Sequence, residues 1–159
     1  MSLTPTASWI ALAIAGETPK VEVDTETGRV TITRLVNVAD AGTPINPRIV
    51  ETQLSGAAIM QIGFTLTEKM EFDAEGQLRN ASLAEYRIPG FHDLPRVMTN
   101  ETVDAAQRSG PFGAKGVGET STFGVSPAIA NAIHDAVGVR LTALPMNPEA
   151  VYMAMQAKK

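Results

Sequence analysis

The stretch VEVDTETGRVTITRLVNV, residues 21–38, decides the fold of this 159-residue chain. Apolar side chains alternate with polar ones on both sides of a turn-forming run at residues 24–28. Such alternation is typical of strands that bury one face, and Gly28 can take the positive φ that a tight turn needs. The stretch therefore predicts a β-hairpin whose valine and isoleucine side chains face a core.

Three helices are predicted from residues that suit a helix start. Asn46 and Asn147 each precede a proline, and Ser126 precedes Pro127. A short polar side chain accepts a hydrogen bond from a free N–H of the first turn, and proline has no N–H to lose there. Gly138 is expected to end the second helix. The first helix is predicted to bury Ile49, Val50, Leu54, Ala57, Ala58 and Ile62.

The remaining segments predict further strands and turns. Residues 64–72 alternate like a strand, and residues 73–76 carry turn residues. Prolines and a glycine make residues 85–95 irregular, whereas residues 96–103 again suit a strand. The chain shows no internal repeat. We therefore expect the α+β class, a single domain of mixed or antiparallel strands with about three helices.

Composition excludes several classes of function. The net charge is −4 and the basic residues are scattered, so the chain lacks the basic stripe that binds nucleic acid. It has no cysteine, which excludes disulfides, thiolate zinc sites and iron–sulfur ligands within this chain. The apolar run at residues 9–15 is far shorter than the ~20 residues of a membrane span and follows no basic residue. We expect it to be a buried strand or an edge of the core, in a cytoplasmic protein with no membrane contact.

A long glycine-rich loop at about residues 105–125 is the candidate for chemistry. Glycines at this density let backbone N–H groups approach a ligand closely. The loop is not a phosphate loop, because Lys115 is followed by Gly116 and not by serine or threonine. The dinucleotide fingerprint also fails, since no third glycine follows Gly118 at the required spacing. The loop glycines are Gly110, Gly113, Gly116 and Gly118.

Glu119 closes the glycine run, and its carboxylate has two interpretations. In a partly dry pocket, desolvation disfavours the charged form of a glutamate and moves its pKa towards the range useful for a general base. Alternatively, the carboxylate only bonds backbone amides of its own loop. The residues alone leave both open. His92 and His134 lack a second ligand at useful spacing, so no histidine metal site is expected.

The loop sequence GAKGVGE, residues 113–119, is similar to the signature of the molybdenum hydroxylases. This family includes xanthine dehydrogenase, aldehyde oxidase and carbon monoxide dehydrogenase. The resemblance continues in the family's order over about residues 20–155. Its other segments are DAGTPINP (40–47), QLSGA (53–57), YRIP (86–89), DLP (93–95), SPAIANAI (126–133) and LPMNP (144–148).

The resemblance implies that this chain is part of a larger catalytic subunit. The family's large subunit is several times longer, so residues 1–159 correspond to the C-terminal portion of its molybdopterin-binding domain. Residues 1–19 are either an added leader or part of an N-terminal strand. The implied partners are the rest of the molybdopterin subunit and the subunits that carry iron–sulfur clusters and FAD. A homo-oligomer also fits, because a part of a larger subunit exposes apolar surface.

The resemblance also implies a cofactor, molybdenum held by a molybdopterin, and a role for individual residues. Glu119 stands at the position of the family glutamate that activates a metal-bound hydroxide as a base, for oxidation of an aldehyde or N-heterocycle. Gln53 matches a glutamine that hydrogen-bonds the pterin. The other implied cofactor-binding residues are Gly116, Val117 and Gly118. None of the implied site residues is a metal ligand.

Three alternatives remain open from the sequence. The chain could be a non-catalytic binding or assembly module that keeps the fold, or it could bind only a small anion in the glycine loop. Lys115 could balance charge near the cofactor or pair with a carboxylate. As part of an enzyme, the chain is expected to be inactive on its own.

Overall fold

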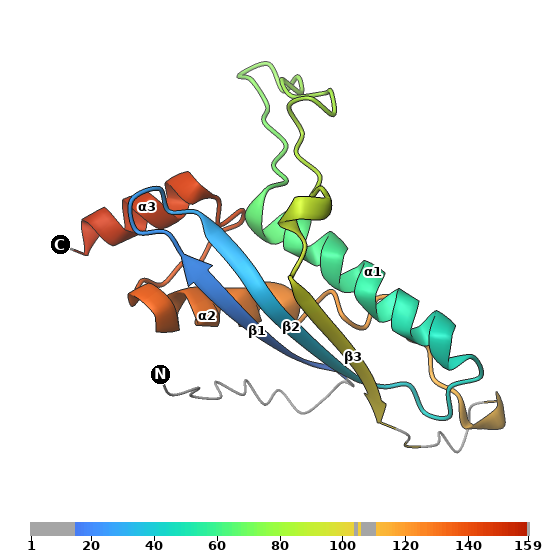
Figure 1. Ribbon diagram of the computed structural model, residues 1–159. Coiled ribbons are helices and arrows are strands. Elements are labelled where there is room, and N and C mark those ends of the chain that lie inside the picture. The colour runs from blue at the N-terminus through green and yellow to red at the C-terminus, as the bar shows by residue number, and fades with distance from the viewer. Residues whose placement is uncertain (1–14, 104, 106–110, 159) are drawn as a thin grey trace.

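The computed structural model describes residues 15–103, 105 and 111–158. They form a three-stranded sheet with helices packed against it and one long excursion that leaves the body (Figure 1). Residues 9–14 of the apolar run lie outside the described residues, and Ala15 begins the first strand. No helix in these ranges is long and apolar enough to cross a membrane.

The predicted β-hairpin is confirmed. Strand β1, Ala15–Val23, pairs antiparallel with β2, Val30–Asp40, with a bulge between Lys20 and Val21. Gly28 has a φ of 76°, and an added Cβ there would overlap the backbone of Pro148. The turn therefore needs glycine both for its backbone angle and for its close approach to the start of the last helix.

Strand β3, Val97–Val103, is confirmed and lies parallel to β2, which gives the order β1-β2-β3. A parallel neighbour requires a crossover connection, and helix α1, Pro47–Leu66, provides it. The sheet is therefore mixed, and the predicted α+β class with about three helices is confirmed.

Helix α1 begins as predicted, because the Asn46 side chain accepts a hydrogen bond from the Ile49 N–H at 3.2 Å. Its predicted apolar face is confirmed except at one position. Ile49 is 63% exposed, since it lies in the first turn beyond the edge of the sheet-facing stripe. The residues of this face that are buried are Val50, Leu54, Ala57, Ala58 and Ile62.

The strand predicted over residues 64–72 is wrong. Helix α1 continues to Leu66, and beyond it only Phe72 makes an isolated bridge, to Leu78. Tertiary contacts override the alternation here, because the Thr65 hydroxyl is buried and lies 2.6 Å from the hydroxyl of Ser126 on another helix.

Helix α2, Val125–Val137, ends at Gly138 as predicted but does not begin at Ser126. Its N-cap is Gly124, and no side chain caps it. The Ser126 hydroxyl instead accepts a hydrogen bond from Gln61 on α1 at 2.5 Å. A polar contact between the two helices has replaced the predicted cap.

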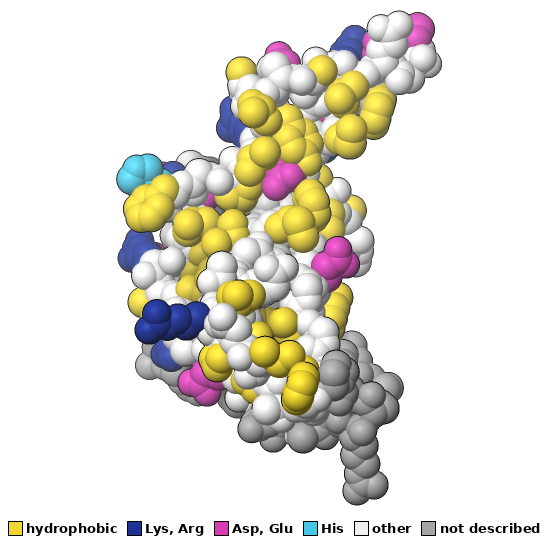
Figure 2. Space-filling view, turned by 90° about the vertical axis from the view of Figure 1, so that its right-hand side faces the viewer, with side chains coloured by type: hydrophobic (Ala, Val, Ile, Leu, Met, Phe, Trp, Pro, Cys, Tyr) yellow, Lys and Arg dark blue, Asp and Glu magenta, His cyan; other side chains and the backbone are white. Residues whose placement is uncertain are grey.

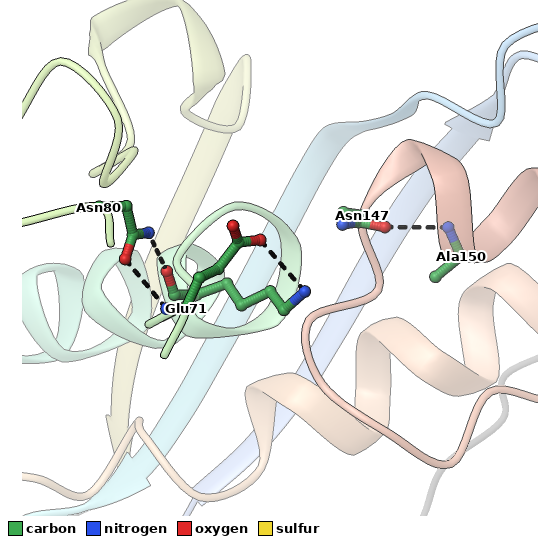
Figure 3. A network of polar contacts seen from close by, with 5 residues as sticks. Glu71, Asn80, Asn147 and Ala150 are labelled. Atoms are coloured by element: carbon green, nitrogen blue, oxygen red, sulfur yellow. Dashed lines mark hydrogen bonds and ion pairs between the residues drawn. The ribbon is translucent and has the colours of Figure 1, made fainter. Parts of the chain in front are cut away.

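Helix α3, Pro148–Ala157, is capped as predicted by Asn147, whose side chain accepts from the Ala150 N–H at 2.9 Å (Figure 3). The main core lies between the inward face of β2 and the helices. Its large, fully buried side chains are Leu35, Ile62, Val125, Ile129, Ile133 and Val151. A second, smaller cluster joins the end of β2 to the start of α1 and comprises Ala39, Ala41, Val50 and Leu54.

Residues 67–90, called the arm, leave the body between α1 and the short helix η1, Phe91–Asp93 (Figure 1). Asn80 holds the two sides of the arm together, because its side chain accepts from the Glu71 N–H and donates to the Lys69 carbonyl (Figure 3). Gly76 has a φ of 79°, as the predicted turn requires. Hydrophobic side chains gather on the projecting part (Figure 2). Its large exposed apolar residues are Met70, Phe72, Leu83 and Ile88.

Candidate functional site

The glycine loop is fastened to the segment that joins β2 to α1. Residues 113–115 lie antiparallel to residues 41–43, which places the loop at the end of the sheet where β2 terminates. The backbone contacts are Thr43 N–H to Gly113 O at 2.9 Å, Lys115 N–H to Ala41 O at 3.0 Å, and a bridge between Gly42 and Ala114. Because these bonds join two backbones, they fix the path of the loop relative to the sheet.

The Lys115 side chain pairs with Asp40, at 2.5 Å between Nζ and Oδ2, and both side chains are 23% exposed. The Lys115 ammonium, helped by the Gly42 N–H, holds the pKa of Asp40 below its ordinary value. Of the two roles considered for Lys115, the structure shows the pairing with a carboxylate. Sequence reasoning missed Asp40 and Gly42 as residues that shape the site, although both lie in the segment DAGTPINP.

Gln53 and Gly118 meet, although 65 positions separate them in the chain. The Gln53 side chain projects from α1 and donates its Nε2–H to the Gly118 carbonyl at 3.2 Å. Gln53 is exposed, and across the described residues its amide oxygen accepts no hydrogen bond. Two of the predicted cofactor-binding residues therefore form one surface.

The backbone of residues 116–118 is open on its outer side. A Cβ added at Gly116 or Gly118 would meet nothing within 4 Å. Within the described part of the chain, the N–H groups of residues 116–119 donate no hydrogen bond. Val117 faces the other way, and its side chain packs against the second core cluster. Val117 thus anchors the loop while the neighbouring amides remain available to a ligand.

Glu119 begins a turn that leads into α2. Its carbonyl accepts from the Thr122 N–H at 3.1 Å and from the Thr122 hydroxyl at 2.7 Å, so its backbone is fixed. Its side chain is exposed, and across residues 15–103 and 111–158 the carboxylate receives no hydrogen bond. Among the described residues of the loop, the carboxylate therefore has no partner.

Two hollows of the described surface are lined by residues other than the predicted site residues. One of about 910 Å³ lies between the arm and the body and is bordered by Arg29, Ile62, Arg87 and Met146 among others. A smaller one of about 220 Å³ adjoins the glycine loop, between Ala114, Lys115 and the start of α1. The described residues contain no group of three or more acidic or histidine side chains that could hold a metal. We locate the site at the N–H groups of residues 116–119, which donate no hydrogen bond among the described residues, and at the exposed side chain of Gln53. These groups suit a ligand with many donors and acceptors.

Comparison with known proteins identifies relatives of this chain. Residues 6–95 match the model of the family described as molybdopterin cofactor-binding domain. The chain is 35% identical over 159 residues to a probable hypoxanthine oxidase, XdhD, of Escherichia coli K12. It is 37% identical over 139 residues to the gamma subunit of the 6-hydroxypseudooxynicotine dehydrogenase complex of Paenarthrobacter nicotinovorans. These matches cover 98% and 86% of this chain, but only 17% and 18% of the respective relatives.

A solved structure shows the same fold. Quinoline 2-oxidoreductase from Pseudomonas putida 86 superposes with a TM-score of 0.84 at 33% sequence identity. The match covers 89% of this chain and 18% of that chain. The fold described above therefore occurs in nature as a small part of a much longer polypeptide.

Proposed function

This chain belongs to the family of molybdopterin cofactor-binding domains, and from that premise we propose that it is part of a molybdenum-dependent hydroxylase. The proposed reaction is the oxidation of an aldehyde or an N-heterocycle with oxygen derived from water. The names of relatives support this reaction class, since they include a probable hypoxanthine oxidase and an aldehyde oxidoreductase molybdenum-binding subunit. Residues 1–159 would form the C-terminal portion of the cofactor-binding subunit.

The meeting of Gln53 with Gly118 is the observation that carries the proposal. The exposed side chain of Gln53 would hydrogen-bond the pterin, and the N–H groups of residues 116–118 would bind its polar atoms. The residues present therefore fit the group. When bound, the molybdenum–molybdopterin cofactor supplies a redox-active, Lewis-acidic metal that takes up the electrons of the substrate's C–H bond.

Glu119 is the proposed general base. Its backbone is fixed by the turn, its carboxylate has no competing partner in the described chain, and it directly follows the proposed cofactor-binding segment. It would take a proton from the water that provides the oxygen atom, so that this oxygen can attack an electron-poor carbon. The remainder of the subunit would cover the carboxylate and exclude bulk water.

Partners follow from the same premise. The chain matches 17% of the length of XdhD, so we propose that the rest of the cofactor-binding subunit packs against it. Iron–sulfur and flavin groups on other domains or subunits would carry the electrons away. We place the complex in the cytoplasm, with self-association of the chain as a further expectation.

The test is Glu119→Gln in the reconstituted complex, with Glu149→Gln as the control at the exposed start of α3. We expect Glu119→Gln to lower kcat for aldehyde or purine by about 10²–10⁴-fold, the range of a lost general base. Molybdenum content per complex should stay at the wild-type level in both variants. Turnover near wild type with full molybdenum loading would refute the base assignment and favour a non-catalytic module.

A further inference from the structure

A line of polar side chains, one buried and two half-buried, crosses the layer between the sheet and α1. Asn37 on β2 donates its Nδ2–H to Asn100 Oδ1 on β3 at 2.7 Å. Asn100 in turn donates its Nδ2–H to the hydroxyl of Ser55 on α1, also at 2.7 Å. Ser55 lies two positions after Gln53, so this polar seam ends beside the proposed cofactor-binding residue.

The other end of the seam is incomplete. Asn37 is 0% exposed, and its Oδ1 has no hydrogen-bond donor among the described residues. Glu17 on β1 is the direct antiparallel partner of Asn37, so their side chains lie on one face about 5 Å apart at Cβ. The Glu17 Oε1 atom is also buried without a partner in the same part of the chain. Two neighbouring residues on one face of the sheet thus each carry a buried acceptor atom without a donor.

Glu17 also contacts the start of α2. A Cβ added at Gly124 would overlap the Glu17 carboxyl group, so this group lies directly against the Gly124 backbone. Gly124 is the N-cap of α2 and ends the turn that begins at Glu119. No side chain caps α2, so the Glu17 carboxyl group that packs against Gly124 from β1 is one of the contacts that hold this turn.

We propose that Glu17 is a positioning residue for the Glu119 turn. In its neutral form it donates a hydrogen bond to Asn37 Oδ1 and completes a polar seam from Ser55 on α1 to the N-terminus of α2. The seam then holds the turn that carries Glu119 at a fixed place relative to the helix that carries Gln53. This role rests on the proposed function of Glu119.

The neutral form is accessible near neutral pH, because burial raises the pKa of Glu17 to about 7. A folded-state pKa above the ordinary value of 4.5 means that the stabilisation is complete below pH 4.5 and is lost as the pH rises through about 7. The hydrogen bond from Glu17 to Asn37 thus forms under mildly acidic conditions and is lost in alkaline ones.

Any test must distinguish the effect of Glu17 from the effects of the other charged groups on the elements around it. They are Arg34 and Asp40 of β2, Glu119 of the turn, and His134 and Asp135 of α2. None of them forms a hydrogen bond or ion pair with Glu17 in the described chain. His134 therefore receives a control variant of its own in the test below.

The experiment measures hydrogen exchange of the amides of residues 120–126 in the full chain, in which Glu17 is replaced by Gln or by Met. Both replacements keep the length of the side chain, but only Gln can donate a hydrogen bond to Asn37. At pH 6 we expect Glu17→Met to lower the protection of these amides about ten-fold, and Glu17→Gln to match wild type. Equal protection in the two variants would overturn the proposal.

A second measurement stands even if Glu17→Met fails to fold. Between pH 5.5 and 8.5, these amides of the wild-type chain should lose protection with a midpoint near 7, and Glu17→Gln should abolish that transition. Glu22→Gln, at an exposed position of the same strand, and His134→Gln should both retain it. A transition that persists in Glu17→Gln, or one that is absent from wild type, contradicts the proposal.

Turnover separates this proposal from the proposed function. Both proposals hold if hydrogen exchange of residues 120–126 changes as expected and kcat of the assembled complex changes in parallel. In that case Glu17→Met lowers kcat, and Glu17→Gln keeps the wild-type kcat. If exchange responds but Glu119→Gln leaves kcat unchanged, the seam positions the turn and Glu119 is not the base.

Discussion

The glycine loop and the arm are both long irregular segments, yet they are held in opposite ways. Residues 113–118 are tied to the body by backbone bonds to residues 41–43, by the ion pair with Asp40 and by the Gln53 side chain. The arm, residues 67–90, is held at its sides by its own bonds, such as those of Asn80 to residues 69 and 71. Contacts with the body therefore determine the position of the loop, whereas bonds within the arm determine the conformation of the arm.

This difference indicates what each segment does. A segment fixed against the core can present backbone amides at a defined place, which a cofactor site requires. A preformed arm with exposed apolar side chains is suited to be covered by other polypeptide. The first segment belongs to the proposed site, and the second to the proposed contact with the rest of the subunit.

Of the changes in the loop and the arm, the largest effect should come from replacing the glycine at the contact between the loop and the body. Gly42 has a φ of 61°, and a Cβ there would overlap the carbonyl of Gly113. Gly42→Ala adds left-handed strain of about 1–2 kcal/mol and must also displace a backbone group. We expect its total loss of unfolding free energy to exceed about 2 kcal/mol, measured by urea denaturation.

The matched control is Gly76→Ala in the arm. Gly76 has a φ of 79°, but a Cβ there would meet nothing within 4 Å. Only the strain of about 1–2 kcal/mol remains, and local adjustment of the exposed turn should reduce it. If the two variants lose equal stability, the loop is not held by close contact with residues 41–43.

A smaller effect is expected from the ion pair of the loop. Asp40→Asn keeps the acceptor for the Gly42 N–H but removes the charge that faces Lys115. Because the folded-state pKa of Asp40 is lowered, its contribution is present above the ordinary value of 3.8 and is lost as the pH falls through the folded value. The urea midpoint of Asp40→Asn should therefore fall below wild type at pH 7, and the difference should vanish at low pH.

The arm provides the control for this pair as well. Lys69 and Glu71 are 3.2 Å apart but 54% and 53% exposed. Water and salt screen such a pair, so Glu71→Gln should leave the midpoint unchanged at either pH. An equal response in Glu71→Gln and Asp40→Asn would mean that the half-buried position of the loop pair has no importance.

The sequence predicted much of the body, because its signals are local. Alternation in residues 21–38 and the side chain of Asn46 each determine structure within a few positions. The strand predicted at residues 64–72 failed, because the end of α1 is decided by Thr65 and Ser126, which are 61 positions apart. For the same reason the start of α2 was misplaced at Ser126.

The site was less accessible to sequence reasoning. No periodicity brings Gln53 to Gly118, and only the resemblance to a known family suggested that the two act together. The role of Lys115 was undecided until the fold placed Asp40 beside it. The polar seam at Glu17 could not be predicted either, because it depends on strand register. The hairpin turn sets that register, and the bulge between Lys20 and Val21 then shifts it by one residue.

The smallest effect on stability is expected in the arm, where Phe72 and Leu83 are 59% and 79% exposed. Replacing both by Ser should change the free energy of unfolding by less than about 0.5 kcal/mol per site, since neither side chain is withdrawn from water. Leu54→Ala in the second core cluster, by contrast, should lose about 2–5 kcal/mol. The arm variant should nevertheless self-associate less than wild type in sedimentation velocity at equal concentration, because it presents less apolar surface.

A large loss of stability in the arm variant would show that the arm packs on the body of its own chain. Unchanged self-association would show that the apolar residues of the arm do not form the surface through which the chain associates. Either result would remove the distinction between a loop held by the core and an arm shaped for a partner.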